Sequence, residues 1–335
     1  MPEIIDALLS DLASRYSDRR IHVFDVKGST QESNRLKFEG RVLDSSGLAA
    51  LSRAAGEGFP AWEVDVSGVR VLRKTPTCMA YVATNITSVH AEPSWLAEML
   101  TQNTFGTAVE ILEEQERWVF IRQSDGYLGW MYRPYLTDLP APAPTYIVTK
   151  PVTPILSEPV AKSALNSRLV GGTLVQVVST CGAWAEVDSN VWGWISLSDL
   201  RSLDDFPRSV EDRRKAMVGD VFRMIGVPYL WGGTTVNGID CSGLAQLIHR
   251  WSGVTIARDA DMQFEAARKI EQPFQPGDLL FFGEKSEPHK ITHVAISLGD
   301  WRIIHSSRSR NGVYLDDVQE VEHLREDFIG AGTFL

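Results

Sequence analysis

The spacing of apolar residues changes along the chain, and each change predicts a different kind of element. Residues 1–75 combine two patterns: Ile21–Val26 has the composition of a strand, whereas Ser46–Ala55 carries Leu48 and Leu51 on one side of an expected helix. These patterns predict a small α/β unit over residues 1–75. Nothing in this unit carries recognisable chemistry, so we expect it to act as a scaffold.

Two stretches in the middle of the chain share one β-rich plan. Residues 76–139 and residues 145–203 each contain short strand-like runs, separated by turns, in the same order. The expected strands are Thr107–Leu112, Trp118–Arg122, Thr173–Val178, Trp184–Val187 and Val191–Ile195. This weak internal repeat predicts two small β-barrels of the bacterial SH3-like type. The proline-rich segment 139–144 between them is expected to be an extended linker.

The last stretch, residues 208–335, begins with helical spacing and ends with strands. A helix is expected from Val210 to Ile225, stopping at Gly226, and a second from Cys241 to Trp251. The expected strands are Asp278–Phe282, His293–Leu298 and Trp301–His305. Helices followed by an antiparallel meander indicate an α+β domain.

Composition and charge exclude several classes of protein. The 335 residues include 43 acidic and 33 basic side chains, a net charge of −10, and no basic run stands out. Nucleic acid is therefore not the expected partner, because phosphate binding needs clustered cations. No apolar run is long enough to predict a membrane span. The acidic first ten residues do not resemble an export signal, so a cytoplasmic location is expected if the natural chain begins here.

Cys241 is the strongest candidate nucleophile. The 3 cysteines lie far apart, which argues against a disulfide framework or a zinc site. Cys241 stands where a glycine-containing loop meets the expected helix, and free amides with the helix dipole are expected to lower its pKa. The same amides suit a developing oxyanion. Cys78 and Cys181 lie in β-rich stretches and are interpreted as small buried residues.

Two histidines on neighbouring strands are the expected partners of this thiol. His293 opens one strand and His305 ends the next, so both share a face if an odd number of residues forms the turn. A turn of residues 298–300 would place them directly opposite each other, and one ring would then orient the other. His289 is the alternative base, and His249 is interpreted as a surface residue.

At these residues the chain resembles the NlpC/P60 cysteine peptidases. The matching motifs are Pro228–Gly233, Asp240–Gly243, Pro276–Leu279, His293–Ala295 and His305. The resemblance implies a papain-like fold over residues 208–335, with Cys241 as nucleophile, His293 as base and His305 as the orienting third member. It also implies that Tyr229 donates a hydrogen bond to the oxyanion, and it implies no metal or cofactor.

The two SH3-like stretches ahead of the peptidase make the chain similar to the γ-D-glutamyl-L-diamino acid endopeptidases. This subgroup recycles muropeptides, and its first SH3-like domain restricts the site to free stem peptides with an N-terminal L-alanine. The implied partner is therefore a peptidoglycan-derived tripeptide or tetrapeptide. The residues expected to bind the substrate are Glu92, Tyr127, Asp240, Ser242, Arg258 and Asp259. A solvated loop glutamate explains Glu92 as well, and a surface ion pair explains Arg258 with Asp259.

Three other functions remain open on the sequence. The first is an exported hydrolase of intact peptidoglycan that uses its SH3-like domains as wall anchors. The second is a binding module with an inert peptidase fold, which the set of Cys241, His293 and His305 disfavours. The third is acyl transfer or amidase chemistry on the same core. The residues do not distinguish meso-diaminopimelate from lysine in the substrate.

Overall fold

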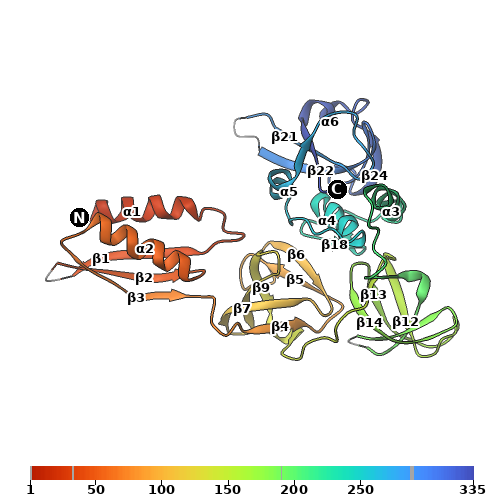
Figure 1. Ribbon diagram of the computed structural model, residues 1–335, viewed down its shortest axis with the longest axis horizontal. Coiled ribbons are helices and arrows are strands. Elements are labelled where there is room, and N and C mark those ends of the chain that lie inside the picture. The colour runs from red at the N-terminus through yellow and green to blue at the C-terminus, as the bar shows by residue number, and fades with distance from the viewer. Residues whose placement is uncertain (1, 32–33, 190, 287–289) are drawn as a thin grey trace. The chain divides into compact units, whose positions relative to one another are not determined.

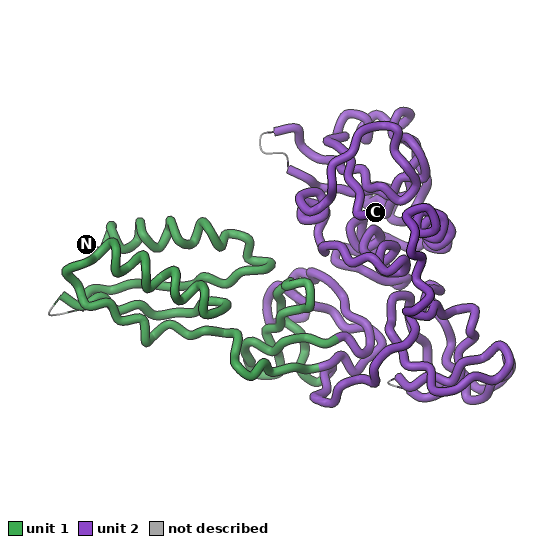
Figure 2. Tube along the Cα trace, viewed as in Figure 1, with its two compact units in different colours: residues 1–80, 108–134 green, residues 81–107, 135–335 purple. Residues whose placement is uncertain are grey.

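The computed structural model describes residues 2–31, 34–189, 191–286 and 290–335 (Figure 1). The chain divides into two compact units (Figure 2). Unit 1 comprises residues 1–80 and 108–134, and unit 2 comprises residues 81–107 and 135–335. The protein is multidomain and mostly β, and its α-helices lie in the first 60 and the last 130 or so residues of the chain.

Unit 1 begins with two helices on a three-stranded sheet. The elements are α1 (Pro2–Arg15), β1 (Phe24–Gln31), β2 (Arg35–Val42), α2 (Ser45–Gly58) and β3 (Glu63–Val71). Strands β1 and β2 form an antiparallel hairpin, and α2 is the crossover that lets β3 lie parallel to β2. Helix α2 covers the expected Ser46–Ala55, and the Asp44 side chain caps its first turn. Leu51 is buried, whereas Leu48 is partly buried.

The rest of unit 1 is an antiparallel meander. It consists of β7 (Ala108–Gln115), β8 (Trp118–Arg122) and β9 (Leu128–Tyr132), so both strands expected here are present. The turn before β9 needs Gly126, whose φ of 92° favours glycine. Ion pairs join the meander to the first sheet: Glu113 accepts from Arg41 and Arg70 at 2.6 Å each, and Glu110 accepts from Arg73 at 3.0 Å.

Unit 2 begins with a hairpin that contacts the loop before α4. Strands β5 (Ile86–His90) and β6 (Met99–Thr104) pair antiparallel, with residues 91–98 as the connecting loop. The short β10 (Leu136–Thr137) pairs with Tyr81 and Val82 at the end of β4 (Met79–Val82). Residues 138–145, which include the proline-rich segment, then run without helix or strand.

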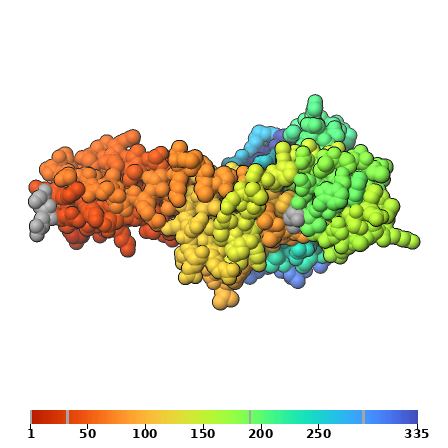
Figure 3. Space-filling view, turned by 90° about the horizontal axis from the view of Figure 1, so that it is seen from below, coloured from red at the N-terminus to blue at the C-terminus, as the bar shows by residue number. Residues whose placement is uncertain are grey.

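The second β-rich stretch forms a seven-stranded sheet in the order β13-β12-β16-β15-β14-β11-β17. Its strands are β11 (Tyr146–Val148), β12 (Val152–Leu156), β13 (Leu165–Val170), β14 (Leu174–Cys181), β15 (Trp184–Asp188), β16 (Gly193–Ser196) and β17 (Leu200–Ser202). The sheet and helix α3 (Val210–Phe222) form one continuous surface (Figure 3). A buried ion pair joins them, because Arg201 on β17 donates to Asp220 on α3 at 3.0 Å.

The last part of unit 2 is a six-stranded antiparallel sheet between helices, in the order β20-β25-β21-β22-β23-β24. Its strands are β20 (Arg268–Ile270), β21 (Leu279–Glu284), β22 (Lys290–Gly299), β23 (Arg302–Ser307), β24 (Gly312–Asp317) and β25 (Phe328–Thr333). Its helices are α4 (Cys241–Trp251), α5 (Ala260–Ala266) and α6 (Glu322–Asp327), with a two-stranded ribbon of β18 (Thr234–Thr235) and β19 (Gly238–Ile239) before α4.

Two apolar clusters on alternate strand positions hold this sheet between its helices. Val294 and Ile296 of β22 belong to the cluster that includes Leu244 and Trp251 of α4, whereas Ala295 belongs to the cluster that includes Leu324 of α6. The α+β architecture expected for residues 208–335 is therefore present. No helix within the described residues is both long and apolar enough to cross a membrane.

Three expectations from the sequence are wrong in detail. Helix α3 ends at Phe222, three residues before the expected end, and a turn leads to Gly226. His249 is fully buried, because the apolar face of α4 extends around its last turns. Cys78 and Cys181 are exposed, because Cys78 lies just before β4 and Cys181 is the last residue of β14, beside the turn at Gly182.

Candidate active site

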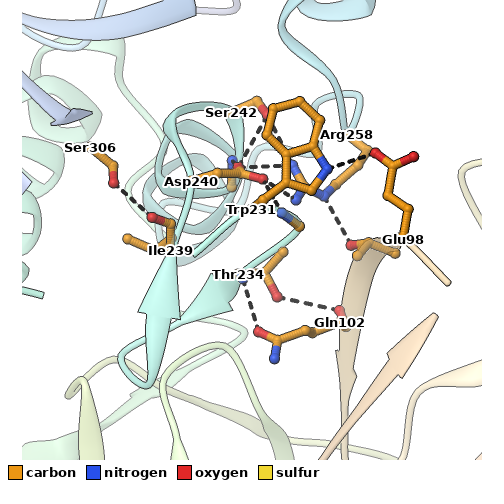
Figure 4. A network of polar contacts seen from close by, with 12 residues as sticks. Glu98, Gln102, Trp231, Thr234, Ile239, Asp240, Ser242, Arg258 and Ser306 are labelled. Carbon is orange, nitrogen blue, oxygen red and sulfur yellow. Dashed lines mark hydrogen bonds and ion pairs between the residues drawn. The ribbon is translucent and has the colours of Figure 1, made fainter. Parts of the chain in front are cut away.

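Cys241 occupies the first position of α4. The helix begins there because the preceding Asp240 has extended backbone, and its carboxylate accepts the Gly243 N–H at 2.7 Å. The loop in front of the helix is held in turn, because Ser306 on β23 donates its hydroxyl to the Ile239 carbonyl at 2.6 Å (Figure 4). The Cys241 side chain is partly exposed. The thiol therefore stands at the end of a well-anchored helix.

The sulfur of Cys241 lies against the strand that carries His293. The backbone N–H groups of Val294 and Ser242 both hydrogen-bond to the sulfur. The Val294 N–H is available for this bond because β23 does not pair with it. The pairing of β22 with β23 starts at Gly299–Arg302 and ends at Ile296–Ile304. The first turn of α4 meets β22 where that ladder ends.

The two expected histidines are brought together. Nε2 of His293 lies 2.7 Å from Nδ1 of His305, and the rings are nearly perpendicular, at 70°. His305 is 2% exposed. This bond uses Nε2 of His293, which leaves its Nδ1 as the nitrogen for proton exchange with a thiol. Among the described residues no hydrogen bond joins Cys241 to an imidazole, as is common before substrate draws such groups together.

The reason the histidines share a face differs from the expected one. The turn contains two residues, Asp300 and Trp301, because Gly299 pairs with Arg302. A two-residue turn alone would put the histidines on opposite faces. A β-bulge at Leu298 restores the shared face and shifts the register so that Ile296 faces Ile304. The two histidines are therefore diagonal neighbours rather than directly opposite residues.

Asp316 extends this pair and was not found from the sequence. Its Oδ2 lies 2.9 Å from Nε2 of His305, and its Oδ1 accepts from Arg310 at 2.6 Å. The bond with His305 is the main cause that lowers the pKa of Asp316. The available signal was Asn311, which ends the four-residue loop 308–311 with a φ of 55° that asparagine tolerates, because this loop sets the register of β23 with β24.

Burial keeps the thiol and its base neutral at pH 7. It raises the pKa of Cys241 to about 12, and the neighbouring Asp240 carboxylate acts in the same direction. It lowers the pKa of His293 to about 3, with His305 as a smaller cause. The expected lowering of the thiol pKa is therefore wrong, since burial and the Asp240 charge outweigh the backbone N–H groups of Val294 and Ser242, which act in the opposite direction. The resting pair is a thiol beside a neutral imidazole.

This charge state predicts slow alkylation of Cys241. Because its thiolate fraction at pH 7 is very small, we expect iodoacetamide to react tens of times more slowly than with an ordinary thiol, after allowing for the greater nucleophilicity of a more basic thiolate. The rate should rise about tenfold per pH unit between pH 7 and 10. Peptide mass spectrometry measures this, with exposed Cys78 and Cys181 as internal references. A fast plateau near pH 6 would instead indicate a thiolate–imidazolium pair.

Tyr229 lies beside the nucleophile, as expected. It forms a β-bridge with Ile239, the residue two positions before Cys241. Burial raises the pKa of its phenol, and the nearby Cys241 and Asp240 raise it further. The hydroxyl therefore stays protonated near neutral pH and can donate a hydrogen bond.

The expected substrate residues Asp240, Ser242 and Arg258 instead bond to one another (Figure 4). Arg258 is 2% exposed, and two of its nitrogens donate hydrogen bonds to the Asp240 carboxylate, at 2.6 and 3.1 Å. Asp240 also accepts the backbone N–H groups of Gly232 and Gly243, at 2.9 and 2.7 Å. Because a carboxylate offers about four lone-pair positions, this occupancy argues against Asp240 as the acceptor for a substrate ammonium. It also shows that Arg258 is not a surface residue.

The β5–β6 hairpin contacts the loop before α4 directly (Figure 4). Glu98 accepts from the Trp231 indole at 2.7 Å, and Gln102 accepts from the Thr234 N–H at 3.1 Å. Gly232 has a φ of 74°, and a Cβ there would stand 2.3 Å from the Met99 carbonyl oxygen. The hairpin therefore helps to shape the loop that positions the nucleophile. Sequence reasoning missed these contacts, because no local pattern marks them.

The remaining expected residues lie in different surroundings. Glu92 is exposed, in the loop that also carries Glu98. Asp259 is partly buried and directly precedes α5. Tyr127 belongs to unit 1, where it is 3% exposed in the turn before β9. His289, the alternative base, lies outside the described residues. Within the described chain, no cluster of three His, Cys, Asp or Glu side chains is arranged to hold a metal ion.

A helix-start cysteine against a strand with a histidine pair is the arrangement expected of a cysteine peptidase. Comparisons with known proteins agree with this class. Residues 226–331 match the model of the NlpC/P60 family, and residues 89–133 match that of the bacterial dipeptidyl-peptidase SH3 domain. The chain therefore contains an NlpC/P60 domain, which supports a cysteine peptidase, together with a bacterial dipeptidyl-peptidase SH3 domain.

Similar proteins align with most of the chain. A γ-D-glutamyl-L-lysine dipeptidyl-peptidase of Bacillus cereus is 27% identical over 266 residues, which are 73% of this chain and 78% of the relative. Dipeptidyl-peptidase 6 of Lysinibacillus sphaericus is 29% identical over 270 residues, 74% of this chain and 95% of the relative. The crystal structure of an NlpC/P60 family protein from Bacillus cereus has the same fold, with a TM-score of 0.68 and 23% identity over 77% of this chain and 99% of that one.

Proposed function

We propose that this protein hydrolyses the bond between γ-D-glutamate and a diamino acid in free peptidoglycan stem peptides that begin with L-alanine. Cys241 is the nucleophile, His293 the general base and His305 the residue that orients it. One observation carries the proposal: the Cys241 sulfur accepts the Val294 N–H, directly after His293, whose ring is held by His305 at 2.7 Å.

The reaction starts from neutral partners. As the sulfur attacks the γ-carbonyl carbon, the thiol proton moves to Nδ1 of His293, a sulfur–carbon bond forms and the carbonyl electron pair moves onto oxygen. The Cys241 N–H and the Tyr229 hydroxyl stabilise that oxyanion. When the carbon–nitrogen bond breaks, His293 returns the proton to the leaving amine. Water then attacks the thioester with His293 again as base, which releases the L-Ala-γ-D-Glu acid and the free thiol.

The substrate is supported by two kinds of observation. The relatives from Bacillus cereus and Lysinibacillus sphaericus are named as dipeptidyl-peptidases, and such an enzyme releases two residues from a free amino end. A substrate ammonium needs an acceptor with negative charge. Asp240 is already paired with Arg258, so Glu92, an exposed carboxylate, is the better acceptor, with Tyr127 and Asp259 as the further contacts that the family resemblance implies.

Cleavage should depend on the free amine. We expect L-Ala-γ-D-Glu-meso-diaminopimelate to be cleaved at least about 100-fold faster, in kcat/KM, than its N-acetylated twin, because acetylation removes a charge worth about 3 kcal/mol in such a contact. Glu92→Gln should narrow this ratio by raising KM for the free peptide alone. Mass spectrometry of the products measures both. The exposed Glu158, in the 145–203 stretch, offers a matched control as Glu158→Gln.

Other outcomes would favour the alternatives. Equal cleavage of both peptides would reject the amine requirement. Efficient release of products from whole sacculi would favour a hydrolase of intact peptidoglycan, whereas the proposed enzyme should leave sacculi nearly unchanged. The lysine-containing tripeptide, assayed in parallel, identifies the preferred diamino acid.

A further inference from the structure

The histidine pair continues into a line of four side chains. From the sulfur outwards, His293 bonds to His305, His305 to Asp316 and Asp316 to Arg310, at 2.7, 2.9 and 2.6 Å. His305 is 2% exposed and the Asp316 side chain 14%, whereas the Arg310 side chain is 48% exposed. The line therefore runs from the expected base, His293, to solvent.

The ionised carboxylate of Asp316 determines which ring nitrogen of each histidine carries the proton. The bonds with His305 and Arg310 lower the pKa of Asp316, so Asp316 carries no proton at neutral pH and can only accept hydrogen bonds. A neutral His305 must then carry its single proton on Nε2, which leaves Nδ1 bare. His293 must carry its own on Nε2 to donate to that bare nitrogen. The remaining nitrogen, Nδ1 of His293, is therefore unprotonated.

We propose that Asp316 is a positioning residue that sets the tautomers of both histidines and so keeps Nδ1 of His293 free to accept the thiol proton. This inference rests on the function proposed above. Arg310 contributes by holding Oδ1 of Asp316, which directs Oδ2 at His305. Arg310 is itself held over the Tyr314 ring, 4.4 Å from its centroid. Asp316 needs no contact with the substrate for this role.

Asp316→Asn should reverse the donor and acceptor roles in each hydrogen bond between Asp316, His305 and His293. In Asp316→Asn, Arg310 keeps the amide oxygen, so the NH₂ group faces Nε2 of His305. His305 must then move its proton to Nδ1, and His293 must move its proton to its own Nδ1, where it blocks the base. We expect kcat to fall roughly 10²–10⁴-fold, as wrong-tautomer substitutions do in catalytic triads, with KM changed less than about threefold.

A second substitution separates this effect from a structural one. In Asp316→Asn/Arg310→Ala the amide is free to turn and present its oxygen to His305. The double variant should therefore be at least about tenfold more active than the single variant, although it lacks one more side chain. A double variant no more active than Asp316→Asn would overturn the role of Arg310, because simple loss of structure makes the two changes accumulate.

A readout independent of activity keeps this inference separate from the proposed function. Long-range ¹H–¹⁵N spectra of the full chain distinguish protonated from bare ring nitrogens. We expect Nε2–H on both histidines in the parent and Nδ1–H on both in Asp316→Asn. Asp300→Asn, an exposed change in the turn between β22 and β23, should alter neither the tautomers nor kcat. Unchanged tautomers in Asp316→Asn would overturn the inference. Inactivity of the parent towards stem peptides would overturn the proposed function alone.

Discussion

Cys241→Ala is expected to abolish turnover, with kcat/KM falling by roughly 10⁴–10⁶. Every bond change in the proposed reaction passes through this sulfur, and no other described cysteine lies at a helix start. Alanine keeps the helix N-cap, because Asp240 bonds to the Gly243 backbone and not to the thiol. Steady-state cleavage of the stem tripeptide, followed by mass spectrometry, measures the loss.

Folding and binding should survive this change. We expect the thermal midpoint of Cys241→Ala to stay within a few degrees of the parent, and the tripeptide to bind with a Kd near the parent KM. Cys181→Ala, an exposed change on β14, should leave kcat/KM unaltered. If Cys241→Ala kept more than about one hundredth of the parent activity, the thiol would not be the nucleophile.

Arg258→Met is expected to cause the largest loss of stability. It leaves the Asp240 carboxylate, whose side chain is 8% exposed, without its cation beneath the first turn of α4. Removing one partner of a buried ion pair costs about 3–5 kcal/mol of unfolding free energy. For a unit of this size that lowers the midpoint by roughly 6–20 °C. Thermal unfolding followed by circular dichroism measures the shift.

Removing both charges of the Asp240–Arg258 ion pair is the control for Arg258→Met. Asp240→Asn/Arg258→Met removes both charges and keeps a side chain able to cap α4, so most of the lost stability should return. Lys290→Met breaks an exposed pair with Glu284 and should cost less than about 1 kcal/mol. A double variant as unstable as Arg258→Met would show that Arg258 stabilises the protein through its Thr101 and Ser242 contacts instead.

Local patterns were sufficient for the elements and for most of the site. Helix α4 was predicted because apolar residues recur at helical spacing up to Trp251 and Gly253 follows, and β21 to β23 were predicted from their apolar runs. The shared face of His293 and His305 was predicted from strand alternation, although a bulge at Leu298 produces it and not the expected turn. These inferences depend only on neighbours in the chain, so the sequence contains the information they need.

The partners of charged groups were predicted less well. Asp240 and Arg258 were expected to face the substrate, yet each satisfies the other in the interior. Glu98 and Trp231 meet although more than a hundred positions separate them. No alternation or spacing relates such residues, because their contact depends on how the β5–β6 hairpin packs against the loop before α4.

The sequence by itself determined that a reactive thiol opens a helix and that two histidines follow on adjacent strands, because side-chain periodicity and capping act over a few residues. Only the tertiary structure decided the state and surroundings of that thiol. Burial beside Asp240 holds its proton, the bulge at Leu298 returns the histidines to one face, and Asp316 orders their tautomers. Desolvation, register shifts and long-range hydrogen bonds arise from packing between distant segments, which local patterns do not encode.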